Sequence, residues 1–250
     1  MRIKLIHFFS YICAVIILCS CKKQTEQINF PLIKDYYPLS TGKVFIYKLD
    51  STVIPAFGSD LITYSLLAKD SIADTFNDNI GRLSYKVYRF TTDSLQTKPW
   101  TYRSTYYITP TVDDIQLVDD YNLRFIKLIQ PLKENFNWKG NAFIDTKSPD
   151  NNFQYLDNWD YTYQNVNKPY TVLKGTFDST ITVFQRDELS PNTPFDVDFF
   201  QERNYSVEIY AKGVGLIYKE FLHWTWQPTP PPAQYKTNSF GIKLNLVEVK

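Results

Sequence analysis

Residues 205–226 read YSVEIYAKGVGLIYKEFLHWTW, a pattern typical of a β-hairpin. Apolar and polar residues alternate on either side of the KGVG segment, and Gly213 and Gly215 supply the positive φ angles that a tight turn needs. One face of the first strand holds Tyr205, Val207, Ile209 and Ala211. One face of the second strand holds Leu216, Tyr218, Leu222, Trp224 and Trp226, and the other holds Ile217, Lys219, Phe221, His223 and Thr225. The stretch therefore predicts two antiparallel strands.

Strand-like segments of this kind fill most of the remaining chain. They are rich in β-branched and aromatic residues and are bounded by Gly, Pro, Asp or Asn. They cover residues 43–53, 61–69, 82–91, 101–109, 114–118, 123–129, 152–163, 170–185 and 240–249. Helical periodicity is scarce, although residues 61–68 and 193–203 could each form a turn or two of helix. The sequence predicts an all-β fold: a single, strongly curved antiparallel sheet or an open barrel or sandwich, with at most one or two short helices.

The composition excludes two classes of protein. The 250 residues include 19 Tyr and 18 Phe, and hydrophobic residues make up 44% of the chain. Disordered chains are poor in such residues, so a folded core is expected. The 27 basic and 26 acidic side chains leave no excess of positive charge that would attract nucleic acid.

The N-terminus has the pattern of an export signal. Arg2 and Lys4 precede an apolar run over residues 5–18, which is shorter than the roughly 20 residues of a membrane span. The sequence LCSC at residues 18–21 resembles the bacterial lipobox, with Cys21 as the lipidated residue; an uncleaved anchor helix is the alternative. We therefore expect a signal peptide over residues 1–20, a polar tether over 21–34 and a single β-rich domain over 35–250.

Loss of the signal peptide limits the chemistry of the mature chain. It leaves 25 basic and 26 acidic side chains, one cysteine (Cys21) and one histidine (His223). An internal disulfide, a cysteine nucleophile and a zinc site of cysteines or clustered histidines are excluded by count. The segment after Cys21 also lacks the acidic run typical of surface export. We therefore expect an outer-membrane lipoprotein that faces the periplasm.

Three segments carry a family resemblance. YYPLSTGKVFIY at residues 36–47 resembles the YYPLxxGxxWxY opening of uncharacterised lipoproteins from Bacteroidetes, with Phe45 where Trp is more common. PL at residues 131–132 with WKGN at 138–141, and YAKGVGLI at 210–217, resemble later segments of the same group. The resemblance spans about residues 35–250 and implies a lipid-anchored β-rich domain. Its motifs are structural and carry no activity to transfer.

Four Asp-Ser pairs fit the site of periplasmic O-glycosylation in Bacteroidetes, an Asp followed by Ser or Thr and then an aliphatic residue or Thr. The candidate acceptors are Ser51, Ser71, Ser94 and Ser179. The alternative is structural, because Asp and Ser side chains bond nearby backbone groups and so form turns.

No enzyme signature stands out in the sequence. His223 is the candidate general base, but it lies among aromatic residues, which is more typical of a packed side chain. Carboxylate pairs at Asp113-Asp114 and Asp119-Asp120, and at Asp196 and Asp198, could serve as acid and base or bind Ca²⁺, yet none has calcium-loop spacing. Glycine motifs for nucleotide phosphates are also missing. We predict no catalytic residue, no metal site and no cofactor.

The aromatic excess favours a binding function. Aromatic side chains on a concave sheet could stack on sugar rings or enclose an acyl chain, although filling the core and girdle of a large β domain is their more usual role. The candidates for stacking are Trp100, Tyr102, Trp159, Tyr161, Trp224 and Trp226. We predict a membrane-anchored, non-enzymatic protein, shaped by analogy like an open-barrel lipoprotein carrier, that binds a glycan, a lipid or an envelope protein. The alternatives are an assembly subunit of an outer-membrane complex and a hydrolase that uses His223 or a carboxylate pair.

Overall fold

The computed structural model describes residues 31–250 except 57–58, 150, 230–231 and 233. The predicted signal peptide, Cys21 and most of the predicted tether lie outside the described residues. Residues 31–250 form one compact unit, which begins a few residues before the expected boundary at Asp35. No helix in the described part of the chain is long and apolar enough to cross a membrane.

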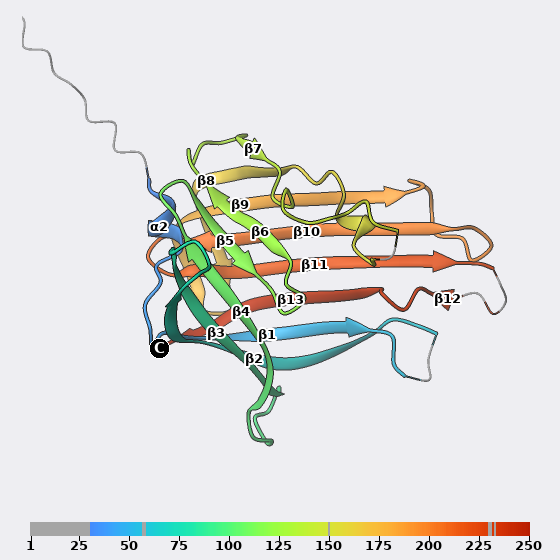
Figure 1. The fold of residues 1–250 in the computed structure, drawn as a ribbon. Coiled ribbons are helices and arrows are strands. Elements are labelled where there is room, and N and C mark those ends of the chain that lie inside the picture. Colours follow the sequence, from blue (N-terminus) through green and yellow to red (C-terminus); the bar gives the residue numbers. More distant parts are fainter. Residues whose placement is uncertain (1–30, 57–58, 150, 230–231, 233) are drawn as a thin grey trace, which may run out of the picture. The chain divides into compact units, whose positions relative to one another are not determined.

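Nearly all regular structure is strand, and the strands join in one antiparallel sheet (Figure 1). Their order across the sheet is β6-β5-β4-β3-β2-β1-β13-β11-β10-β9-β8-β7, and β12 pairs with β11. The strands are β1 (Val44–Val53), β2 (Ile62–Asn77), β3 (Leu83–Asp93), β4 (Thr101–Pro110), β5 (Asp114–Val118), β6 (Arg124–Ile129), β7 (Asn137–Trp138), β8 (Tyr161–Val172), β9 (Gly175–Ser190), β10 (Gln201–Ala211), β11 (Gly215–Gln227), β12 (Gln234–Tyr235) and β13 (Phe240–Val249). The helical segments are α2 (Ile33–Tyr36) and the 3₁₀ turn η1 (Gln154–Leu156). The predicted fold class is confirmed.

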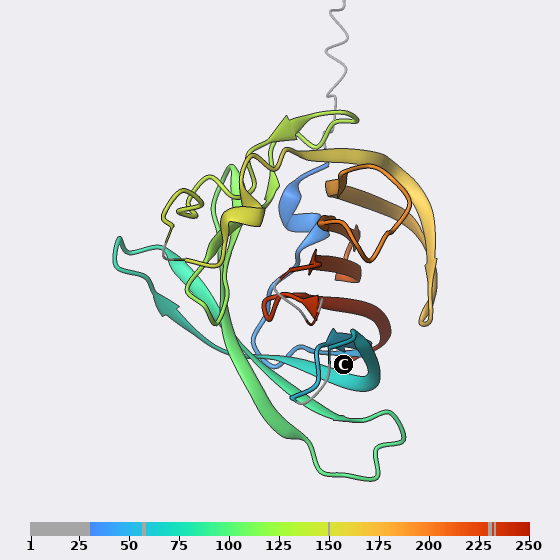
Figure 2. The same ribbon diagram turned by 90° about the vertical axis from the view of Figure 1, so that its right-hand side faces the viewer.

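The sheet curls until its two edges meet, which produces a nearly closed barrel (Figure 2). The Ile126 amide of β6 donates to the Gly140 carbonyl at 2.8 Å, and the Trp138 indole donates to the Ile126 carbonyl at 2.9 Å. The Tyr163 hydroxyl accepts from the Ile129 amide at 2.7 Å and donates to the Ile129 carbonyl at 2.8 Å. The WKGN segment therefore joins the first edge of the sheet to the last.

The opening segment and the β10–β11 turn pack against each other at one end of the barrel. The Gly213 amide donates to the Asp35 carbonyl at 2.6 Å, and the rings of Tyr37 and Tyr210 lie 5.5 Å apart. Gly213 and Gly215 have φ angles of 76° and 114°, as the hairpin pattern predicts. Figure 2 shows α2 inside the ring of strands. Two segments far apart in sequence thus close one end of the barrel.

Residues 61–68 form the first half of β2, which confirms the strand predicted over residues 61–69 and rules out the helical alternative, because their backbone pairs with β1 from Ile62 onward. Two other local predictions were wrong. Residues 193–200 form an irregular loop before β10. The strand expected over 152–163 begins only at Tyr161, since η1 and a hydrogen bond from the Trp159 indole to the Tyr155 carbonyl (2.7 Å) fold the preceding residues into a compact turn.

Candidate functional site: the concave face

Strand pairing identifies the side chains that face the interior of the barrel. Residues directly opposite one another share a face, and the row Leu49–Leu244–Lys219–Glu208 runs through β1, β13, β11 and β10. Leu49 and Leu244 belong to the buried core, so this row faces inward. We call the inward surface of the sheet the concave face.

The concave face of β10 is polar. Asn204, Ser206 and Glu208 lie on it and are at most 2% exposed. The alternate residues Val207 and Ile209 are buried on the other side, so both faces of this strand are covered. Sequence patterning singles out the apolar face of β10 and gives no sign that its polar face turns inward.

Glu208 is the centre of a buried polar cluster. Its carboxylate accepts from Lys127 at 2.6 Å, Tyr210 at 2.7 Å and Gln185 at 3.1 Å, and the Lys219 ammonium lies 3.2 Å away. Burial alone would raise the pKa of Glu208, but the two lysines outweigh burial and lower it to about 2. The carboxylate is therefore ionised at neutral pH and holds β6, β9, β10 and β11 together.

A second ion pair lies on the concave face of β2 and β3. Arg89 donates to both carboxylate oxygens of Asp70, at 2.7 and 2.6 Å, and the Tyr106 hydroxyl donates to Asp70 at 3.0 Å. Burial and the charge of Asp70 raise the pKa of Tyr106, so its hydroxyl remains a donor. The neighbouring cavity, lined by Tyr37, Phe45 and Tyr106 among others, measures about 20 Å³, which is room for one water molecule. This cavity is therefore too small for a ligand larger than water.

His223 is buried in the interior at 1% exposure. Its Nδ1–H donates to the Asn204 side-chain oxygen at 2.8 Å, because the Asn204 amide nitrogen is engaged with Glu202. The ring stacks on Tyr155 with centroids 3.8 Å apart, and Nε2 has no hydrogen-bond partner among the described residues. Burial, with a smaller effect of Lys236, lowers the pKa of His223 to about 4. This geometry favours a structural role for the imidazole.

The low pKa of His223 predicts a loss of stability in mild acid. As pH falls from about 6.5 to about 4, the unfolded chain takes up a proton that the folded chain does not. We expect this one group to lower the free energy of unfolding by up to about 3 kcal/mol over that range. Urea unfolding at pH 7 and pH 4.5 measures the loss, and His223→Gln should reduce the difference between the two values. An equal difference in the variant would contradict the assignment.

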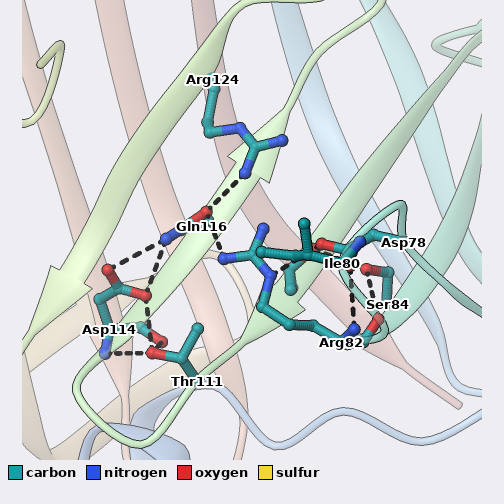
Figure 3. Close-up of polar contacts among 9 residues, drawn as sticks. Asp78, Ile80, Arg82, Ser84, Thr111, Asp114, Gln116 and Arg124 are labelled. Carbon is teal, nitrogen blue, oxygen red and sulfur yellow. Dashed lines mark hydrogen bonds and ion pairs between the residues drawn. The ribbon is translucent and has the colours of Figure 1, made fainter. Parts of the chain in front are cut away.

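The carboxylate pairs proposed as acid and base are engaged in turn contacts. Asp114 accepts from the Thr111 hydroxyl at 2.8 Å and from the Gln116 amide at 3.2 Å (Figure 3). The Gln116 oxygen accepts from both Arg82 and Arg124, at 3.2 and 3.0 Å. This network ties the start of β3 to β5 and β6.

The other acidic candidates also stabilise loops. Asp119 accepts from the amides of Tyr121 and Leu123, at 3.0 and 2.8 Å, and so fixes the β5–β6 turn. Asp196 accepts from the Asp198 amide at 3.0 Å in the β9–β10 loop. One carboxylate of each candidate pair, Asp114, Asp119 or Asp196, therefore has a local structural contact.

On β2, β1, β13 and β11 the concave face carries a mostly apolar row, which is partly open at the end away from α2. The row Tyr64–Ser51–Ile242–Phe221 crosses β2, β1, β13 and β11. Tyr64 is 48% exposed, and Ile62, two residues earlier on the same face, is 43% exposed, because β2 extends beyond the paired part of β3. Figure 1 shows β3 to β6 crossing only the other half of these long strands. We call Ile62, Tyr64, Phe221, Phe240 and Ile242 the open row.

The six predicted stacking residues lie in three separate places. Trp159 and Tyr161 are 1% exposed and fill the core. Tyr102 lies on the outer face of β4 and Trp100 directly precedes that strand, where the Lys69 ammonium is 4.7 Å from the Trp100 ring. Trp224 and Trp226 occupy the outer face of β11, against Phe195 and Tyr235. The structure does not gather the six on one concave surface.

The sequence pattern does not predict the open row. Alternation puts Phe221 on the face opposite Trp224, as in the structure, but nothing in the pattern shows which of the two faces is concave. Ile62 and Tyr64 have the period of a strand, and their position follows only from pairing with β1.

The four candidate glycosylation sites differ in exposure. Ser94 lies exposed in the β3–β4 turn, whereas Ser51, Ser71 and Ser179 are half-buried within strands. The Ser179 hydroxyl also lies 2.9 Å from the Tyr36 hydroxyl. Glycosylation stays a prediction, and Ser94 is the most accessible of the four.

Comparison with known proteins gives two distant structural likenesses. One is to a lipoprotein candidate from Parabacteroides distasonis, at 15% identity and a TM-score of 0.40, covering 86% of this chain and 98% of that one. The other is to a candidate exported protein with a YmcC-like fold from Bacteroides fragilis, at 7% identity and a TM-score of 0.41, covering 84% and 96%. No family profile and no curated protein matches.

Proposed function

We propose that this chain is a lipid-anchored, non-enzymatic protein of the cell envelope that binds an acyl chain along the open row. The observation that carries the proposal is the exposure of Ile62 and Tyr64 on the inside of a curved sheet. Large apolar side chains on a concave surface are typical of ligand sites. The lipobox-like LCSC segment supports the anchor and the compartment.

The chemistry of the open row favours an acyl chain over a glycan. Phe221 and Phe240 stack with centroids 5.2 Å apart and lie beside Ile242, and Phe221 also stacks on the core residue Trp159 at 5.7 Å. The Tyr64 and Ser51 hydroxyls are the polar groups of the row. A sugar needs more hydrogen-bond partners than two hydroxyls provide. Four adjacent strands span roughly 14 Å, and each buried methylene contributes about 0.8 kcal/mol. An acyl chain lying across the strands would therefore gain several kcal/mol.

Native mass spectrometry of the full chain, extracted from its own membranes, tests the proposal. We expect an adduct of lipid mass. In a separate assay, we expect a fluorescent long-chain fatty acid to bind the Ile62→Asp/Tyr64→Asp variant at least about tenfold more weakly, because ligand binding would desolvate the introduced carboxylates. Leu173→Asp is the matched control, because Leu173 is 61% exposed in the β8–β9 turn. Equal binding by the row variant, or a bare mass, would refute the acyl-chain site. The intact mass also reports acylation at Cys21.

A further inference from the structure

The β9–β10 loop, residues 191–200, exposes four large apolar side chains within six residues. Phe195 is 48% exposed, Val197 55%, Phe199 66% and Phe200 46%. Scattered exposed apolar residues are normal on a protein surface, but a contiguous group of this kind marks an interaction surface. In Figure 1 the loop lies at the end of the barrel away from α2.

Buried side chains hold the loop in one conformation. The Gln201 amide donates to the carbonyls of Pro191 and Thr193, at 3.2 and 2.8 Å, and the Trp226 indole donates to the Val197 carbonyl at 3.0 Å. Gln201 and Trp226 are only 3% and 8% exposed. The Phe195 ring packs edge-on against Trp226, with centroids 5.5 Å apart. A preformed loop loses little conformational entropy when it binds.

The charges around the loop are acidic. Residues 186–203 contain five carboxylates and two arginines. Both arginines are already paired, Arg186 with Glu188 and Arg203 with Asp187, each at 2.5 Å. Asp196 and Asp198 alternate with the exposed apolar residues and form no ion pair with any residue that the structure describes. This negative charge would repel an anionic lipid surface. It would attract a protein surface that carries basic side chains.

We propose that the β9–β10 loop docks a protein partner whose contact surface is apolar and bordered by lysine or arginine side chains. The apolar side chains of the loop supply the contact area, and Asp196 and Asp198 face the basic groups of the partner. None of these residues belongs to the open row, so the proposal does not depend on acyl-chain binding.

Photo-crosslinking in the native cells tests the proposal on the full-length chain. The probe is p-benzoylphenylalanine in place of Phe199, and the crosslinked species is identified by mass spectrometry. We expect a discrete adduct with one protein, and we expect Asp196→Lys/Asp198→Lys to reduce its yield by about tenfold or more, because reversed charges repel a basic partner. The purified partner should also bind the unmodified chain more weakly as salt is raised.

Matched controls separate docking from general damage. Asp74→Lys/Asp113→Lys reverses two exposed carboxylates elsewhere and should leave the adduct unchanged. The same probe at Leu173 should not form it. The proposal would be overturned by an adduct with lipid only, by an adduct with a second copy of this chain only, or by no adduct at all. It would also be overturned if the yield of the protein adduct did not change on charge reversal. Fatty-acid binding by the Asp196→Lys/Asp198→Lys variant should be unchanged. Failure of the docking proposal can therefore be told apart from failure of the acyl-chain proposal.

Discussion

Glu208→Gln should lower the free energy of unfolding by about 3–5 kcal/mol at pH 7, because it leaves the Lys127 ammonium buried without its counterion. Lys127 and Glu208 are 5% and 1% exposed, and their charged atoms are 2.6 Å apart. Solvent therefore cannot replace the lost carboxylate. The side-chain oxygen of the introduced glutamine can still accept from Gln185 and Tyr210. The loss of stability therefore measures mainly the missing charge.

Urea unfolding measures this loss, and two further variants test its cause. Lys127→Met/Glu208→Gln removes both charges and should be less destabilised than Glu208→Gln alone. Glu248→Gln breaks an exposed pair with Lys250 and should leave the unfolding curve unchanged. A double variant as unstable as the single one would show that the cluster acts through packing instead of charge.

Gly140→Ala should destabilise the fold by about 3 kcal/mol or more, because a Cβ at this position would overlap the Tyr161 ring. Tyr161 is 1% exposed and its hydroxyl donates to the Asn141 side-chain oxygen at 2.8 Å, so the ring has no room to move. The Gly140 carbonyl also accepts from Ile126 across the closure of the barrel. Displacing it would separate the first and last edges of the sheet.

Thermal and urea unfolding of Gly140→Ala measure the effect against Gly42→Ala. Gly42 has a φ of 84°, and no atom lies within 4 Å of the place that a Cβ would take, so its substitution costs only backbone strain, about 1 kcal/mol. Hydrogen exchange should show the amide of Ile126 opening first in Gly140→Ala. Similar losses in the two variants would mean that closure of the barrel contributes little to stability.

The fold class followed from local patterns that have a direct physical meaning. Alternation around Gly213 and Gly215 predicts a hairpin, and the structure places both glycines at positive φ. The turn at Asp119–Asn122, bounded by two apolar segments, is likewise a hairpin, with Asn122 at a φ of 62°. Such signals are set within a few residues, so sequence reasoning can find them.

The concave face could not be predicted because it depends on contacts between distant segments. Strand alternation shows that Phe221 and Trp224 point in opposite directions, but only the curl of the whole sheet decides which one faces inward. The polar residues Ser206 and Glu208 look like a solvent-facing side, yet Lys127 from β6 pairs with Glu208 and Ser206 donates to Gln185 of β9. Trp159 is buried for the same reason, because the loop between β7 and β8 that carries it folds against Phe221 of β11.

The first strand of this sheet is hydrogen-bonded to the last, with Phe45 opposite Val249 and Thr52 opposite Gly241. A growing polypeptide therefore cannot complete the sheet until β13 has been synthesised, and such non-local topologies fold slowly for their size. A product cut short before β13 would present β1 and β11 as two bare strand edges. Bare edges recruit strands from other molecules, so we expect truncated chains to aggregate and to be degraded instead of accumulating as a smaller folded protein.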